Sequence, residues 1–266
     1  MSAQRIVTLT TDFGIHDHFA GVMRGVVLNI NPKAQVVDIC NSVNSFDVLD
    51  GALTIAQSYS YFPSETVHLI VVDPGVGSAR RPILVTTTRH SFVAPDNGVL
   101  SLVYAREERI TVRHITSEHF FLQPVSNTFH GRDIFAPVAG WLSKGVDPAK
   151  FGEEIDDYVR FAMPTPKVEG NTVKAVVLKV DKFGNLITNI DAATVPQLFG
   201  DKIPAFSVAV GNAETSEMRT SYSNGENGHL FAIYGSTGYL EVAVNRGSAA
   251  QIAQARRGSE VTITFK

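Results

Sequence analysis

Thiols are almost absent from this chain, in which Cys40 is the single cysteine. A lone cysteine excludes an intramolecular disulfide and a zinc site built from several thiolates, and it favours a reducing compartment such as the cytoplasm. Apolar runs are also short, and none approaches the roughly 18 residues that a membrane-spanning helix needs. We therefore expect a cytoplasmic protein that has no membrane partner.

The chain also lacks a large excess of charge of either sign. The 266 residues include 23 Lys and Arg against 26 Asp and Glu, which gives a net charge of −3. No overall basic field is available to hold a polyanion, so we expect no nucleic-acid partner. The hydrophobic share of 44% is that of an ordinary globular protein, and the length allows two domains.

The first part of the chain alternates between short β-rich runs and longer amphipathic stretches. The patterns predict strands at 5–11, 35–40, 67–72, 83–88 and 91–94, and helices at 18–30, 48–61, 97–105 and 134–144. The run at 67–72 is continuously apolar, as expected of a strand that is covered on both faces. This order predicts an α/β N-terminal domain with a mostly parallel sheet and helices on both of its faces.

The pattern changes near residue 165. Met163, Pro164, Thr165 and Pro166 form a proline-rich segment that would make a suitable linker. Alternating runs follow at 172–180, 205–210, 229–234, 239–244 and 260–265, and helix-length patterns are scarce there. We therefore predict a smaller C-terminal antiparallel β-barrel domain, with domains at 1–165 and 166–266.

Four polar clusters stand at the ends of predicted elements in the first domain. They are Asp12 with 16–18 after the first strand, Asp73 to Arg81 after the third, Asp96 and Asn97 after the hairpin, and Asn127 to Asp133 before a helix. Ligands of open α/β sheets bind beyond the carboxyl ends of the strands, so these clusters predict a site. Each cluster taken alone is better explained by helix caps and turns, and it is the convergence of four clusters that favours a site.

Three local motif matches fail on context. Asp12-Phe13-Gly14 has the letters of the kinase magnesium motif, but no glycine-rich loop or catalytic loop precedes it. Gly75-x-Gly77 lacks the third glycine of a dinucleotide fingerprint. The histidines of His16-Asp17-His18 are adjacent on one loop and chelate poorly without partners elsewhere. We therefore predict no metal and no cofactor.

Six linked motifs carry a family resemblance over essentially the whole chain. TTDFG, VDPGVGSARR, APDNG, FHGRDIFAP, DKFGNLITNI and GYLEVAVN occur in this order. Together they resemble the S-adenosyl-L-methionine (SAM) hydroxide adenosyltransferases, or SAM hydrolases, which are related to fluorinating and chlorinating enzymes. The resemblance implies an α/β domain followed by a β-barrel. It also implies a homotrimer that binds SAM between the N-domain of one subunit and the C-domain of its neighbour.

The resemblance implies a metal-free displacement reaction, in which SAM and water give adenosine and methionine. The family's catalytic triad maps onto Asp73, Arg80 and His130. Water is a weak nucleophile, so it must be held in line with the bond that breaks and relieved of a proton. Arg80 can stabilise hydroxide character, and either Asp73 or His130 can accept the proton. The sequence leaves open which of the three triad members is the base.

The same motifs imply the substrate-binding residues. Asp12 resembles the aspartate that binds both ribose hydroxyls, and Phe46 the aromatic beside the sugar and the sulfonium. Asp17 is expected near the methionine ammonium, with a capping role equally open. The remaining positions are Asn97 and Phe129 in the N-domain, Asp181 and Asn185 toward the amino-acid end, Phe183 between them in sequence, Tyr222 on the adenine, and Ser236.

Three positions depart from the pattern of the family or its relatives. Asn41 stands where histidine is frequent, and Thr237 and Val244 stand where the halogenating relatives carry arginine. The halogenating branch replaces the triad with smaller or hydroxyl-bearing groups that hold a halide, whereas this chain keeps all three members. Water is therefore the expected nucleophile. The alternatives are a halogenase that uses chloride or fluoride, and a non-catalytic adenosyl-binding sensor.

Overall fold

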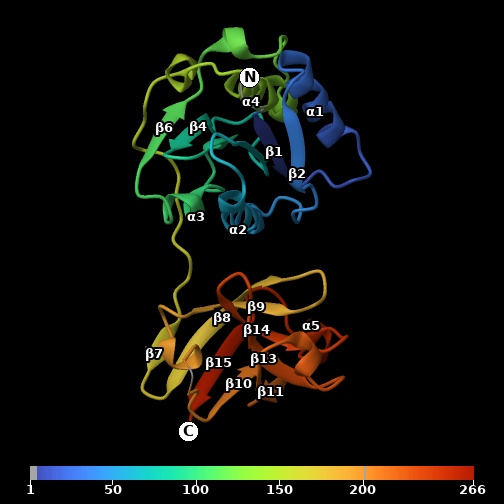
Figure 1. Ribbon diagram of the computed structural model, residues 1–266, viewed down its shortest axis with the longest axis vertical. Coiled ribbons are helices and arrows are strands. Elements are labelled where there is room, and N and C mark those ends of the chain that lie inside the picture. The colour runs from blue at the N-terminus through green and yellow to red at the C-terminus, as the bar shows by residue number, and fades with distance from the viewer. Residues whose placement is uncertain (1–4, 201) are drawn as a thin grey trace. The chain divides into compact units, whose positions relative to one another are not determined.

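The computed structural model describes residues 5–200 and 202–266. The chain divides into two compact units, Met1–Ala162 and Met163–Lys266 (Figure 1). Within the described residues, no helix combines the length and the apolar character that crossing a membrane requires.

The first unit is built on a mostly parallel sheet with the strand order β2-β1-β3-β5-β4-β6. Neighbours among β2, β1, β3 and β5 run parallel, whereas β4 pairs antiparallel with both β5 and β6. The strands are β1 (Ile6–Thr11), β2 (Gln35–Cys40), β3 (Val67–Val71), β4 (Pro82–Thr87), β5 (Ser91–Pro95) and β6 (Ile110–His114). The predicted mostly parallel sheet is confirmed.

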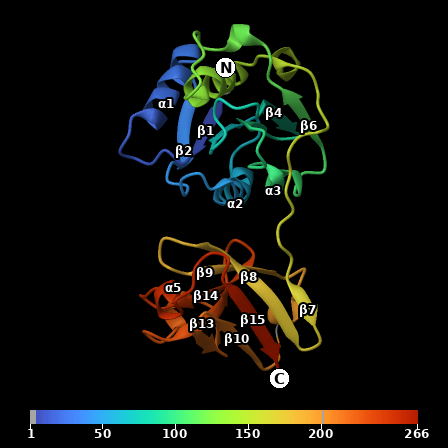
Figure 2. The same ribbon diagram turned by 180° about the vertical axis from the view of Figure 1, so that it is seen from behind.

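Helices cover both faces of this sheet, as predicted (Figure 1). One face carries α1 (Phe19–Ile30) and α4 (Ala136–Ser143), and the other carries α2 (Val48–Ser58) and α3 (Ser101–Tyr104). Alternation along β3 explains the two cores, because Leu69 packs on the α1 and α4 side and Ile70 on the α2 side. Figure 2 shows the same layers from behind. Short helical turns are η1 (Tyr59–Tyr61), η2 (Glu118–Phe120), η3 (Gly131–Phe135) and η4 (Pro148–Phe151).

The helix predicted at 97–105 is wrong over its first half. Gly98 has a φ of +92° and Asn97 is bonded to strand and turn backbone, so the α-helix comprises only Ser101–Tyr104. The helix predicted from 134 begins earlier, because a π-helical turn over Gly131–Phe135 leads into α4. Edge strand β6 was not predicted.

The second unit is a mostly antiparallel sheet with the order β11-β10-β15-β8-β9-β14-β13-β12, and β7 pairs with β8. The pair of β12 with β13 is parallel. The elements are β7 (Lys167–Glu169), β8 (Thr172–Val180), β9 (Leu186–Asp191), η5 (Pro196–Leu198), β10 (Phe206–Val210), β11 (Ala213–Thr215), β12 (Met218–Arg219), η6 (Tyr222–Asn224), β13 (Leu230–Tyr234), β14 (Tyr239–Val244), α5 (Ala249–Ile252) and β15 (Glu260–Phe265).

This sheet curls on itself. The Thr215 hydroxyl at the end of β11 donates to the Leu230 carbonyl of β13, which brings distant parts of the strand order together. Apolar side chains from β8, β10, β14 and β15 fill the enclosed side. The predicted antiparallel barrel-type domain is confirmed as a curled half-barrel.

Candidate active site

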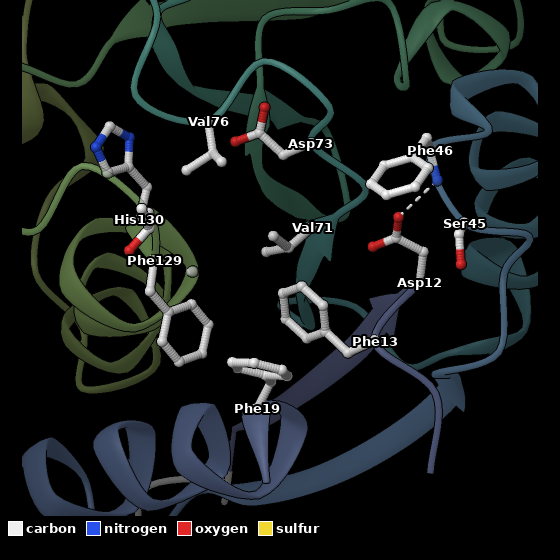
Figure 3. Close-up of a pocket in the computed structure, with 12 residues that line it drawn as sticks. Asp12, Phe13, Phe19, Ser45, Phe46, Val71, Asp73, Val76, Phe129 and His130 are labelled. Atoms are coloured by element: carbon white, nitrogen blue, oxygen red, sulfur yellow. Dashed lines mark hydrogen bonds between the residues drawn. The ribbon is translucent and has the colours of Figure 1, made fainter. Parts of the chain in front are cut away.

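A pocket of about 290 Å³ lies at the carboxyl edge of the parallel strands in the first unit. Asp12 enters it from the end of β1, Asp73 from the end of β3, and His130 from the residue before the π-helical turn (Figure 3). Parallel strands end at one edge, which is why residues so distant in sequence meet here. The volume is near the lower end of the range for small-molecule sites.

Arg80 joins Asp73 and His130 at this site. Its Nε lies 2.9 Å from both oxygens of Asp73, and its Nη2 also donates to Asp73. The same Nη2 lies 2.8 Å from Nδ1 of His130. The side chains of Arg80 and Asp73 are only 8% and 5% exposed, and the guanidinium lies 5.1 Å from the centre of the Phe135 ring. The structure therefore brings the predicted triad together as one hydrogen-bonded unit.

The contact with Arg80 defines the protonation state of His130. A guanidinium can only donate, so Nδ1 of His130 must accept, and the proton of the neutral ring is on Nε2. Burial and the positive charge of Arg80 lower the pKa of His130 from its ordinary value of 6.5, although the Asp73 and Asp133 carboxylates and a hydrogen bond to the Ser126 backbone oppose this. His130 is thus a neutral hydrogen-bond donor at Nε2.

Two loops approach closely to build the triad. Gly77 lies in the loop between Asp73 and Arg80, with a φ of +77°, and a Cβ at this position would lie 2.3 Å from the Asn127 carbonyl oxygen. Only glycine tolerates both the left-handed backbone and this approach. The contact sets the Arg80 loop directly against the segment that leads to His130.

Buried Asp133 supports that segment from the other side. Its Oδ2 accepts from the backbone N–H of Ser126 at 2.8 Å and from the Ser126 hydroxyl at 2.6 Å. The Ser126 hydroxyl oxygen in turn accepts from the N–H of Phe129, and Arg132 pairs with the Asp133 carboxylate. Hydrogen bonds from Arg132 and Ser126 hold the pKa of Asp133 below its ordinary value against the larger single effect of burial, which opposes them.

Asp12 and Phe46 form the opposite wall of the pocket. The N–H of Phe46 donates to Oδ2 of Asp12 at 2.9 Å, as the dashed line in Figure 3 marks. Burial raises the pKa of Asp12, and the nearby Asp73 carboxylate adds to the effect. Phe46 has a φ of +65° and is 74% exposed, a costly backbone conformation for an aromatic residue and one typical of functional loops.

An aromatic cluster that was not predicted as a unit lines the base of the pocket. The rings of Phe13, Phe19 and Phe129 contact one another, with centroid distances of 5.3 to 5.8 Å. Figure 3 shows the three rings gathered on one side of the cavity. Phe129 was predicted from its motif, whereas Phe13 and Phe19 were not. Aromatic residues next to the Asp12 and His130 motifs were the signal available in the sequence.

Two residues predicted to bind substrate, and Asn41, lie outside the lining of the first pocket. The Asn97 amide donates to the carbonyl of Val72 at 2.8 Å and steadies the end of β3 without lining the pocket. Asp17 is exposed in the turn before α1 and is also not among the lining residues. Asn41 is 8% exposed and accepts from the Thr11 hydroxyl, which gives it a structural role between β1 and β2.

The second unit carries a pocket of its own, with a volume of about 650 Å³. Four of its lining residues were predicted from the sequence, namely Asp181, Phe183, Asn185 and Tyr222. The Asp181 carboxylate accepts from the backbone of the DKFGN turn and from the Asn185 amide, so it also shapes this turn. Ser236 lies in the β13–β14 turn, outside the lining set. Arg246 and Ser248 line the pocket and were not predicted.

Across residues 5–200 and 202–266, the structure contains no group of three or more His, Cys, Asp or Glu side chains arranged to hold a metal ion. The two carboxylates of the first pocket are instead engaged by Arg80 and by the N–H of Phe46.

Comparison with known proteins shows the family of this chain. Residues 7–152 match the SAM hydroxide adenosyltransferase N-terminal domain, and residues 175–262 match the corresponding C-terminal domain. The chain therefore belongs to the SAM hydroxide adenosyltransferase family. The two matched regions include the residues that line the two pockets.

Individual relatives cover nearly the whole chain. An (R)-S-adenosyl-L-methionine hydrolase of Salinispora arenicola is 36% identical over 99% of both chains. A fluorinase of Nocardia brasiliensis is 26% identical over 97% of this chain and 96% of its own. A conserved protein of Thermotoga maritima with a known crystal structure is 37% identical, with a TM-score of 0.89 over 97% of this chain and 99% of its own.

Proposed function

We propose that this protein hydrolyses SAM to adenosine and L-methionine by attack of water on C5′ of the ribose. The hydrogen-bonded unit of Asp73, Arg80 and His130 beside the first pocket carries this proposal. The name of the Salinispora arenicola relative supports the reaction and suggests the (R) configuration at the sulfonium.

The chemistry needs a positioned water and little else. As the bond from water oxygen to C5′ forms, the bond from C5′ to sulfur breaks, and its electron pair converts the sulfonium into the neutral thioether of methionine. Nε2–H of His130 donates to the water oxygen and orients a lone pair toward C5′. Because that nitrogen already carries its proton, we assign the role of base to Asp73, which accepts the proton that leaves. Arg80 stabilises the developing negative character of the oxygen.

Asp12 and the aromatic wall suit the adenosyl group. A carboxylate can accept from both ribose hydroxyls, and the bond from the Phe46 N–H to Oδ2 fixes the Asp12 carboxylate at the pocket wall for this task. The ring face of Phe46 favours a positive sulfonium nearby. We assign Asp181 and Asn185 to the amino-acid end, Tyr222 to the adenine, and Phe183 to the wall of the same pocket. Supporting roles at Asp17, Asn97, Phe129 and Ser236 complete the proposal.

The same proposal extends to assembly and location. We propose domains at 1–165 and 166–266, and a homotrimer in which a pocket of the first kind faces a pocket of the second kind from a neighbouring subunit. Light scattering coupled to size-exclusion chromatography tests the trimer. A cytoplasmic location fits the single cysteine.

Incubation of the purified protein with SAM in halide-free buffer tests the function. The proposal predicts adenosine and methionine in equal amounts, above a blank without protein. A 5′-halo-5′-deoxyadenosine in high chloride or fluoride would instead identify a halogenase, for which the fluorinase relatives are the precedent. Tight SAM binding without any product would identify a sensor and contradict the proposal.

A further inference from the structure

A buried carboxylate with no predicted role, that of Glu241, is hydrogen-bonded to a residue that lines the pocket of the second unit. Glu241 is at the centre of β14, between Ile233 of β13 and Ile187 of β9, and it is only 4% exposed. Its Oε2 accepts from the hydroxyl of Tyr222 at 2.8 Å. Burial raises the pKa of Glu241, with the nearby Asp181 carboxylate acting in the same direction.

The fold makes room for this carboxylate. A Cβ on Gly235 would lie 1.9 Å from Oε1 of Glu241, so only glycine at 235 admits the side chain in this position. Burying a carboxylate is costly, and an apolar residue would fill the centre of a strand at lower cost. The hydrogen bond to Tyr222 is the feature that an apolar residue could not supply.

Tyr222 is the link between Glu241 and the pocket. It belongs to η6, lines the pocket, and is 44% exposed although its hydroxyl points to a buried group. Asn245, which directly follows the same strand, donates to the carbonyl of Gly225 at 2.9 Å. The short segment 222–225 is therefore held at both ends from the β14 side, which fixes the ring before any ligand arrives.

We propose that Glu241 is a positioning residue for the substrate, whose carboxylate fixes the Tyr222 ring as a stacking platform for the purine base. The inference deepens the proposed function and rests on it, because Tyr222 is the residue assigned to adenine. A ring held by a charge-assisted hydrogen bond loses less freedom on binding, so the gain should appear in affinity. The chemical step at the first pocket should be almost unaffected.

Four variants test the proposal: Glu241→Leu, Glu241→Gln, Tyr222→Phe and the double variant Tyr222→Phe/Glu241→Leu. The matched control is Tyr234→Phe, since Tyr234 is in the same unit and 52% exposed. Each protein is characterised by kcat and KM for SAM and by calorimetric titration with adenosine, after circular dichroism has verified its fold.

The expected result is a split between binding and turnover. Glu241→Leu and Tyr222→Phe should each raise the KM for SAM and the Kd for adenosine about 10-fold, with kcat changed less than about 3-fold. The double variant should be no weaker than either single variant, because both remove the same hydrogen bond. Glu241→Gln should recover most of the affinity, since its amide oxygen still accepts from the Tyr222 hydroxyl, and Tyr234→Phe should match the wild type.

Wild-type affinity in Tyr222→Phe would overturn the inference. Because this variant keeps the aromatic ring and leaves the core residues unchanged, it tests the inference even if Glu241→Leu does not fold. Additive losses in the double variant would overturn it as well. Both results leave SAM hydrolysis by the wild type intact. A wild-type protein that neither binds adenosine nor consumes SAM would overturn the proposed function and this inference together.

Discussion

The guanidinium of Arg80 donates to Nδ1 of His130 across 2.8 Å while it is also bonded to Asp73. One side chain therefore sets the distance between the other two members of the triad and the tautomer of the imidazole. Because Nε2 keeps the proton, His130 is placed to orient the nucleophile, and the carboxylate is the acceptor that remains.

Replacing Arg80 should disable catalysis without unfolding the protein. Arg80→Lys keeps the charge but has a single nitrogen in place of the planar guanidinium, so it cannot reproduce the paired contacts with Asp73 and His130. Its kcat should fall about 10²-fold, and the kcat of Arg80→Ala should fall at least as far. Arg24→Lys is the control, because Arg24 forms an ion pair with Asp38 near the surface, away from the site. Near-wild-type turnover in Arg80→Lys, measured by adenosine release, would mean that the paired geometry is not needed.

The activity should be lost as the pH falls below neutrality. The pKa of His130 lies below 6.5, and that of Asp12 lies above 3.8. Protonation of His130 turns Nδ1 into a donor that faces Arg80, and protonation of Asp12 removes an acceptor for the ribose. Profiles of kcat and kcat/KM against pH should therefore show an acid limb, to which Asp12 contributes above pH 3.8 and His130 contributes below pH 6.5. Activity that stays constant from pH 7.5 down to pH 3.8, with the fold intact by circular dichroism, would contradict this assignment.

The approach of Gly77 to Asn127 predicts a sharp response to a single methyl group. Gly77→Ala should displace one of the two loops, lowering kcat at least about 10-fold and the free energy of unfolding by about 1 kcal/mol or more. Gly145→Ala is a matched control, because Gly145 also has a left-handed φ of +96° but meets nothing within 4 Å. Gly145→Ala should lower the free energy of unfolding by the cost of the left-handed backbone alone and leave the activity unchanged. Equal activity losses in the two variants would contradict the argument from the close approach.

Two buried histidines outside the site should make folding acid-sensitive. His68 is fully buried and bonded to Thr8, and its ring lies 5.1 Å from that of His90, which is 3% exposed. Burial lowers the pKa of His68 to about 3, with the neighbouring His90 acting in the same direction, and burial also lowers that of His90. The unfolded chain takes up protons near pH 6.5, so stability should be full above this pH and fall progressively as the pH drops below it.

Urea unfolding at pH 5 and pH 7.5 measures this acid sensitivity. The loss of stability at pH 5 should be smaller in His68→Gln than in the wild type, whereas His16→Gln, at an exposed position, should leave the loss unchanged. An identical loss in His68→Gln would show that other groups carry the acid sensitivity.

Local pattern predicted much of this fold. Strands Gln35–Cys40, Thr172–Val180 and Tyr239–Val244 were predicted at their observed bounds, because alternation along a strand is visible within a few residues. The helix expected at 97–105 was wrong over its first half, where the Asn97 amide donates to the carbonyl of Val72, a partner 25 residues away.

The candidate site could also be predicted only in part. Asp12 and Asp73 could be expected at one edge, since the ends of parallel strands meet there, and His130 was expected with them from the family resemblance. Two other contacts could not be predicted, namely that of Glu241 with Tyr222 and that of Gly77 with Asn127. Each depends on how two segments that are distant in sequence pack against each other. A charged residue in the middle of an apolar strand was the one visible sign of the former.

Turnover of SAM in water enriched with ¹⁸O tests most directly the claim that water held by this triad attacks C5′. Mass spectrometry of the products should find one ¹⁸O atom in adenosine, at the 5′-hydroxyl, and none in methionine. Adenosine without the label, formed by the wild-type protein in the same water, would contradict the account.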